Sequence, residues 1–71
     1  MTPKLPRVTA DRAARILERH GFSIVRQSGS HRIYRNAAGI RVTLPMHAGR
    51  ALHPRIVRNI IDDTGIAAEE F

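Results

Sequence analysis

The apolar residues of this chain follow two different spacings, and the first of them predicts a helix near the amino terminus. Between Thr9 and Gly21, small and branched apolar residues recur every three or four positions, as on one face of an amphipathic helix. Thr9 is a suitable N-cap residue, and Gly21 favours the left-handed conformation that ends a helix. Residues 1–8 contain two prolines, and we expect them to form an extended lead-in.

Apolar and polar residues then alternate, which is typical of strands with one buried face. Three strands are predicted, over residues 22–27, 31–35 and 40–44, with short turns between them. Because short turns join consecutive strands, we expect an antiparallel meander. Pro45 lacks a backbone donor and is expected to end the third strand.

Strict alternation also assigns individual side chains to the two faces of this sheet. In the first strand, Phe22 and Ile24 are expected on one face, with Arg26 continuing the same line. In the second strand, the side chains of His31 and Arg32 are expected on different faces of the sheet. A bulge in the preceding turn would exchange the two faces. In the third strand, the residues expected to face inward are Ile40, Val42 and Leu44.

Helical spacing returns after the third strand and predicts a second helix from Pro54 to Gly65. Ile66 is placed to fold back on its last turn, and residues 67–71 could add one further turn. A helix, three strands and a helix predict an α+β fold, with a three-stranded antiparallel sheet that carries both helices on one face. This α-β-β-β-α order is that of double-stranded-RNA-binding domains.

Length and composition indicate a single domain spanning residues 1–71. The chain has no cysteine, so neither a disulfide framework nor a thiolate zinc site is expected. No apolar run approaches the length of about 20 residues that a membrane helix needs. We therefore expect a cytoplasmic protein without membrane contact and without a cofactor.

Charge is distributed unevenly along the chain. Residues 1–58 hold all 12 lysines and arginines, 11 of them arginine, but only two acidic residues, giving a formal charge of +10. The other four acidic residues lie within residues 62–71. A field of this sign attracts polyanions, and arginine binds phosphate bidentately, so nucleic acid is the predicted partner. The few aromatic residues argue against a base-stacking platform.

A flexible turn delivers His31 to the start of the second strand. Gly29 and Ser30 offer backbone amides and a hydroxyl that can approach a phosphate, and an imidazole can transfer protons near neutral pH. On these residues alone, an ordinary β-turn followed by a histidine is an open alternative. We assign His31 as the candidate catalytic residue and predict that Gly29 and Ser30 contact RNA, together with the cations Arg26, Arg32 and Arg35.

Three further histidines need separate assignments. His47 and Arg50, in the connector after the third strand, are predicted to contact RNA, although His47 could equally be a structural cap. His20 is expected to complement the C-terminus of the first helix, and His53 to be an ordinary surface residue. Since no pair of histidines has the helical spacing of a metal site, no metal site is predicted.

Four motifs of the chain resemble the HicA family of toxins from type II toxin–antitoxin systems. They are Gly-Ser-His at 29–31, Pro-x-His at 45–47, Leu-His-Pro at 52–54 and Ile-Ile-Asp-Asp-Thr-Gly-Ile at 60–66. The likeness covers nearly the whole chain beyond the lead-in. At the start of the last helix, the chain has Arg-Ile-Val at 55–57 where the family usually has Gly-Thr-Leu.

The resemblance implies a small, metal-independent ribonuclease that cleaves mRNA and inhibits translation and growth until a HicB-type antitoxin binds it. It gives the catalytic role to His31. The residues are compatible with this chemistry, because RNA supplies its own 2′-hydroxyl nucleophile and the protein needs only a base, an acid and cations. The second proton carrier could be His47, Tyr34 or a water molecule. We expect the free chain to be a monomer or a weak dimer.

Two other functions are compatible with the sequence. A non-catalytic module that binds double-stranded RNA or the ribosome would use the same basic surface, with His31 contacting only a phosphate or a 2′-hydroxyl. An interaction protein would instead pair its sheet edge or its arginines with an acidic partner. Catalysis by His31 distinguishes the ribonuclease hypothesis from both.

Overall fold

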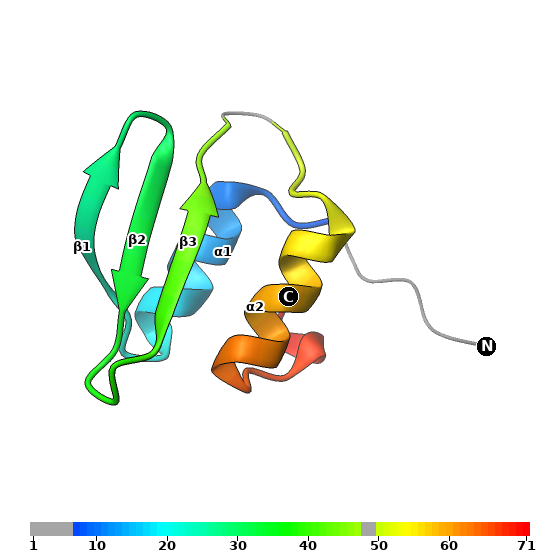
Figure 1. The fold of residues 1–71 in the computed structure, drawn as a ribbon. Coiled ribbons are helices and arrows are strands. Elements are labelled where there is room, and N and C mark those ends of the chain that lie inside the picture. Colours follow the sequence, from blue (N-terminus) through cyan, green and yellow to red (C-terminus); the bar gives the residue numbers. More distant parts are fainter. Residues whose placement is uncertain (1–6, 48–49) are drawn as a thin grey trace.

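The computed structural model describes residues 7–47 and 50–71, and its elements occur in the predicted order (Figure 1). The strands form one antiparallel sheet in the order β1-β2-β3. The predicted α+β fold is thereby confirmed. Among the residues that the structure describes, no helix is long and apolar enough to span a membrane. The elements are α1 (Ala10–Arg19), β1 (Ser23–Ser28), β2 (His31–Arg35), β3 (Arg41–Pro45), α2 (Pro54–Thr64) and the 3-10 turn η1 (Ala68–Glu70).

Helix α1 begins at the predicted cap. The side-chain oxygen of Thr9 accepts a hydrogen bond from the backbone N–H of Arg12 at 3.2 Å, which satisfies one of the free donors at the helix start. At the other end, Gly21 adopts a φ of +85° and the chain turns into β1. Of the predicted lead-in over residues 1–8, only the last two residues lie within the described part. The buried face of α1 is the predicted one: Ala10, Ala13, Ala14, Ile16 and Leu17.

Two tight turns fix the register of β2 against its neighbours. Ser28 pairs with His31, so Gly29 and Ser30 alone form the first loop. Gly29 has a φ of +57° and Ser30 does not have a positive φ, a combination that occurs in type II′ turns. The second turn is closed by Asn36, whose side-chain oxygen accepts a hydrogen bond from a backbone N–H four residues later at 2.9 Å.

Strand β1 contains a bulge that alternation did not predict. Ile24 pairs with Tyr34. The next pair joins Arg26 to Ile33, so one extra residue, Val25, is inserted between the two pairs. Because directly paired residues point to the same side, Arg26 lies on the face opposite Ile24. The predicted line from Ile24 to Arg26 is therefore wrong.

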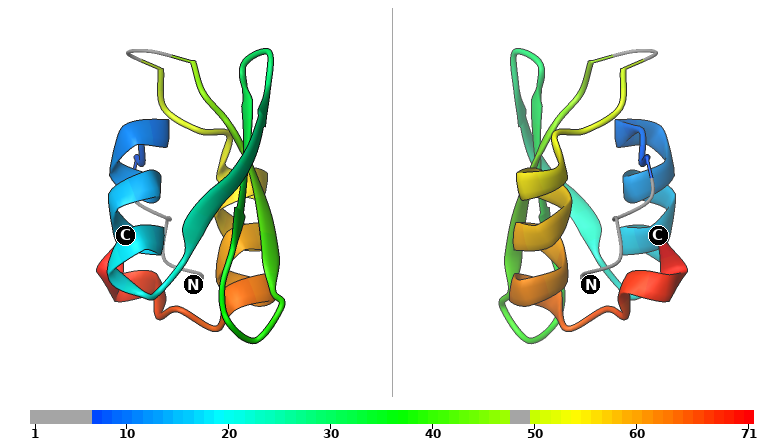
Figure 2. Two further views of the ribbon diagram at one scale, coloured as in Figure 1. Left: turned by 90° about the vertical axis from the view of Figure 1, so that its left-hand side faces the viewer. Right: turned by 90° about the vertical axis from the view of Figure 1, so that its right-hand side faces the viewer.

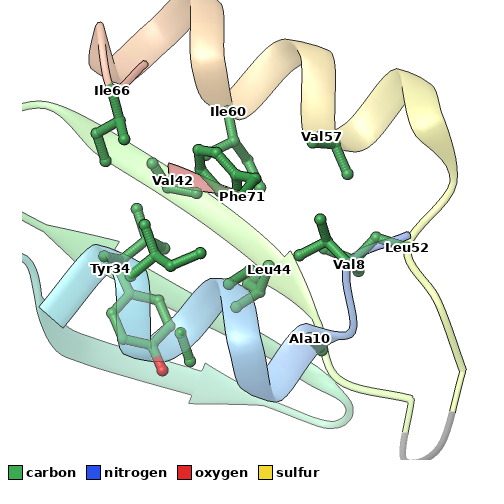
Figure 3. Packing of buried hydrophobic residues seen from close by; sticks show 14 of the residues in the cluster. Val8, Ala10, Tyr34, Val42, Leu44, Leu52, Val57, Ile60, Ile66 and Phe71 are labelled. Carbon is green, nitrogen blue, oxygen red and sulfur yellow. The ribbon is translucent and has the colours of Figure 1, made fainter. Parts of the chain in front are cut away.

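The hydrophobic core lies between one face of the sheet and the two helices (Figure 3). The sheet contributes Tyr34, Val42 and Leu44, and α2 contributes Val57 and Ile60. Figure 1 shows α1 behind the sheet and α2 beside β3, and the side views agree (Figure 2). Both helices therefore contribute to one core on the same side of the sheet, α1 across that face and α2 along the edge strand β3.

Helix α2 begins with a histidine cap. The Nδ1 of His53 accepts a hydrogen bond from the backbone N–H of Arg55 at 3.0 Å, and Pro54 is the first helical residue. The expectation that His53 is an ordinary surface residue is thus wrong, since the ring stabilises the start of α2.

The residues after α2 close the core as predicted. Gly65 ends the helix in the left-handed conformation, with a φ of +74°, and Ile66 folds back and is buried. Phe71 is also buried, and its main-chain oxygen accepts a hydrogen bond from the Nε of Arg12 at 3.2 Å. The end of the described chain is therefore docked on α1.

The cap of α1 gives a test of this fold. We expect Thr9→Ala to lower the free energy of unfolding by about 1 kcal/mol, because a backbone donor of α1 loses its partner. Thr9→Ser keeps the hydroxyl and should restore most of the difference. Urea denaturation followed by circular dichroism measures both variants, and equal stability of Thr9→Ala and the wild type would contradict the role of the cap.

Candidate functional site

The sheet face opposite the core carries His31 and arginines from all three strands. Paired residues point to the same side, so the pairings of β2 define this face. His31, Ile33 and Arg35 lie on it along β2; Arg26 of β1 pairs with Ile33, and Arg41 of β3 pairs with Arg35. We call this surface the open face. It combines an exposed imidazole with three exposed guanidinium groups, a set that suits a phosphodiester backbone.

His31 is exposed and is held by its backbone. It is the first residue of β2, and its Cα partners are Ser28 in β1 and Pro45 in β3. Among the described residues, no hydrogen bond joins its ring to a neighbour. The strand thus fixes the position of His31, while its imidazole is available to exchange protons with a substrate.

The β1–β2 turn and the chain after β3 lie together at the His31 end of the sheet. The backbone N–H of Met46 donates to the carbonyl of Ser30 at 2.6 Å, which continues the pairing of β2 with β3. The backbone N–H of Arg50 donates to the carbonyl of His47 at 3.2 Å, and both side chains are exposed. Five predicted site residues therefore belong to this end of the sheet: Gly29, Ser30, His31, His47 and Arg50.

A groove of about 410 Å³ lies between β3 and α2 and reaches His31. The two elements lie side by side and run in opposite directions (Figure 1). This volume is within the range of pockets that hold small ligands. The groove has a polar lining of His31, Arg41, Thr43, Asn59 and Asp63 and an apolar lining of Val42, Pro45, Ile56 and Ile60.

Arg32 does not lie with the other predicted site residues. It pairs with the core residue Leu44, so its side chain starts from the helix side of the sheet and lies near Glu18 of α1. Its Nε is buried and has no hydrogen-bond partner among the described residues. The structure therefore separates Arg32 from His31, and leaves Arg26 and Arg35 as the predicted arginines on the open face.

Tyr34 is the predicted proton carrier that the structure excludes. The alternation that exposes His31 turns Tyr34 into the core, where it is 1% exposed (Figure 3). Its hydroxyl therefore cannot reach a polynucleotide on the open face. His47 and a water molecule are the other candidates for the second proton transfer.

Comparison with known families identifies the chain. A family model described as HicA toxin of bacterial toxin-antitoxin matches residues 10–66. The chain belongs to the HicA toxin family. The match begins at the first residue of α1 and ends at Ile66, so it includes the whole sheet and the groove beside it. Comparison with individual curated proteins gave no match.

Two of the other histidines in this HicA-family protein have structural contacts. The Nε2 of His20 lies 2.7 Å from an Oε1 of Glu70, so it joins the end of α1 to η1, and His53 caps α2. Among the described residues, no group of three or more His, Asp or Glu side chains is placed to hold a metal ion. His31 is the histidine that shares a face with the arginines and also lines the groove.

Four polar residues that line the groove were not predicted from the sequence: Arg41, Thr43, Asn59 and Asp63. Alternation along β3 did place Arg41 outward, but nothing in the sequence connected it with His31. Asn59 and Asp63 are four residues apart and fall outside the apolar stripe of α2, so they were expected on one polar side of the helix. They line one groove with His31 because α2 lies along β3, which the sequence pattern does not specify.

The turn before His31 gives a second test. No atom lies within 4 Å of the position that a Cβ at Gly29 would take, so a substitution there is disfavoured by its φ of +57° and not by a clash. We expect Gly29→Ala to lower the free energy of unfolding by about 1–2 kcal/mol. Gly29→Asn should cost less, because asparagine tolerates positive φ better. Urea denaturation compares the two, and equal losses would contradict this account of the turn.

Proposed function

We propose that this HicA-family protein is an endoribonuclease, an mRNA interferase, in which His31 transfers a proton during RNA cleavage. The observation that carries the proposal is the exposed imidazole of His31, without a hydrogen-bond partner in the described chain, on a face with three arginines. A histidine serves as general base or acid near neutral pH, and guanidinium groups bind phosphate. Cleavage inhibits translation and growth.

The proposed reaction is an internal transesterification. The ribose 2′-oxygen attacks the adjacent phosphorus, the bond from phosphorus to the 5′-oxygen breaks, and the products end in a 2′,3′-cyclic phosphate and a 5′-hydroxyl. A base takes the proton of the 2′-hydroxyl and an acid protonates the leaving 5′-oxygen. His31 performs one of these transfers, while His47 or a water molecule performs the other.

The cations of the open face have a separate task in this proposal. Negative charge increases on the phosphate oxygens as the 2′-oxygen attacks, so fixed positive groups stabilise the transition state more than the substrate. Arg41 lines the groove that reaches His31, toward the opposite end of that groove. Arg26 and Arg35 bind neighbouring phosphates along the sheet, and the Gly29-Ser30 turn, His47 and Arg50 bind RNA at the His31 end. This donor set allows cleavage without a metal ion.

Control by an antitoxin belongs to the same proposal. The family name refers to toxin–antitoxin systems, and residues 1–58 carry a formal charge of +10. A HicB-type antitoxin with an acidic surface would cover the open face and exclude RNA from His31. In the cytoplasm, the free chain is a monomer or a weak dimer.

Removing the imidazole tests the catalytic assignment. We expect His31→Ala to lower the rate of RNA cleavage by about 100- to 10,000-fold, the usual contribution of general acid–base catalysis. His20→Ala is the matched control, because His20 contacts Glu70 and does not line the groove. Gel assays with a fluorescent RNA, with EDTA present, measure the rate, and cyclic-phosphate product ends are expected. Cleavage by His31→Ala at the wild-type rate would overturn the assignment.

A non-catalytic module that binds double-stranded RNA or the ribosome is the second candidate. The α-β-β-β-α order and the arginines of the open face favour it, because such domains bind RNA mostly through shape and phosphate contacts. This candidate predicts salt-dependent RNA binding by the wild type without any cleavage. RNA cleavage by the wild type that is lost in His31→Ala would favour the ribonuclease over the non-catalytic module.

The open-face arginines give a test that does not require cleavage. The slope of log affinity against log salt should fall in magnitude by about 0.7–1 in Arg35→Ala, because one phosphate contact is lost. Arg58→Ala is the control, since Arg58 lies on α2, outside the open face, 3.8 Å from Asp62. Fluorescence anisotropy with single-stranded RNA measures the slopes. The same slope for Arg35→Ala and Arg58→Ala would show that Arg35 does not bind phosphate.

A further inference from the structure

The groove between β3 and α2 has two chemically different ends. Because β3 and α2 run in opposite directions (Figure 1), the Pro45 end of β3 and its partner His31 lie toward the start of α2, and Arg41 lies toward its end. Four residues of strand separate Pro45 from Arg41, which corresponds to about 13 Å. Asn59 and Asp63 are one turn apart on the helix side of the groove. A chain of nucleotides that places a phosphate at His31 would therefore pass these two side chains.

Asp63 is the lining residue that phosphate binding does not explain. A carboxylate repels phosphate, and Asp63 is the acidic residue among those lining this groove. Within the described part of the chain, no ion pair joins Asp63 to Arg41 or to His31, whereas its neighbour Asp62 lies 3.8 Å from Arg58. The carboxylate of Asp63 is thus available to accept hydrogen bonds from a ligand that carries N–H groups.

The rest of the lining suits the flat ring of a nucleobase. Ile56, which is half-buried, gives the helix side an apolar contact for a ring, and the amide of Asn59 adds a donor and an acceptor. Recognition of single-stranded RNA commonly combines such ring contacts with hydrogen bonds to the Watson–Crick edge. The groove therefore offers both parts of a base-recognition site beside the proposed cleavage site.

We infer that this groove is a guanine-recognition subsite for a nucleotide next to the phosphate at His31. Guanine presents two adjacent donors, N1–H and the 2-amino group, beside the acceptor O6. Asp63 accepts from both donors, and the amide of Asn59 donates to O6. Adenine, cytosine and uracil place at least one acceptor where the carboxylate needs a donor. The inference rests on the proposed function in one respect, that RNA occupies the groove.

The test uses short RNAs that differ at the two nucleotides flanking one cleavable bond. We expect wild-type kcat/KM to be about 10- to 100-fold higher with guanosine than with adenosine or inosine, which lacks the 2-amino group. Asp63→Asn should reduce this ratio to about 1, because the amide has one uncharged acceptor oxygen and cannot accept from both donors of the base. Asp62→Asn, one residue away and outside the groove, is the matched control and should keep the ratio.

Three outcomes would overturn the inference: no guanosine preference in the wild type, the same preference in Asp63→Asn, or equal losses in Asp63→Asn and Asp62→Asn. An equal loss of kcat/KM on every substrate counts as the second of these outcomes, because the preference is then unchanged. Affinities of His31→Ala for the same RNAs separate this inference from the proposed function. If the wild type cleaves no RNA, tighter binding of guanosine-containing RNA that depends on Asp63 still supports the subsite. Binding without such a preference would overturn the subsite.

Discussion

The burial of Tyr34 is the constraint on which the arrangement of the open face depends. Because side chains alternate along a strand, fixing Tyr34 in the core leaves His31 and Arg35 on the other side of the sheet. The turn before β2 and the pairing with β3 keep this phase. The chemistry of the protein is therefore tied to its stability, since a shift of one residue in β2 would bury His31 and expose the aromatic ring.

In a small domain, covering the sheet on one side only concentrates the limited apolar surface in a single core. Both helices contribute their apolar faces to a single core, and a 71-residue chain has little apolar surface to spare for a second one. The face left uncovered can then be polar and strongly cationic without disturbing the core. His31 is carried on a strand rather than a mobile loop, which limits the conformational entropy that this side chain's backbone would lose on binding a ligand.

The helices, the strands and most of the core could be predicted from local sequence patterns. Apolar spacing, helix caps and turn residues each determine structure within a few residues of their own position. The apolar stripe of α1, the cap at Thr9 and the return of Ile66 are of this kind. The bulge in β1 was not predictable in this way, since it depends on how two strands pair. The core-side position of Arg32, which was predicted to contact RNA beside His31, and the groove were not predictable either, because the phase of β2 against the core and the position of α2 along β3 are tertiary properties.

The bulge in β1 has a consequence for how the protein behaves at high concentration. A sheet with a regular free edge can add strands from other copies and grow into aggregates. Here one edge strand, β3, has α2 beside it, and the other, β1, is interrupted at Val25. Ile24 and Val25 are 46% and 51% exposed, which on a straight strand would favour fibril growth. The irregular backbone at Val25 makes this edge a poor template for an added strand, which offsets the aggregation tendency of two uncovered apolar side chains.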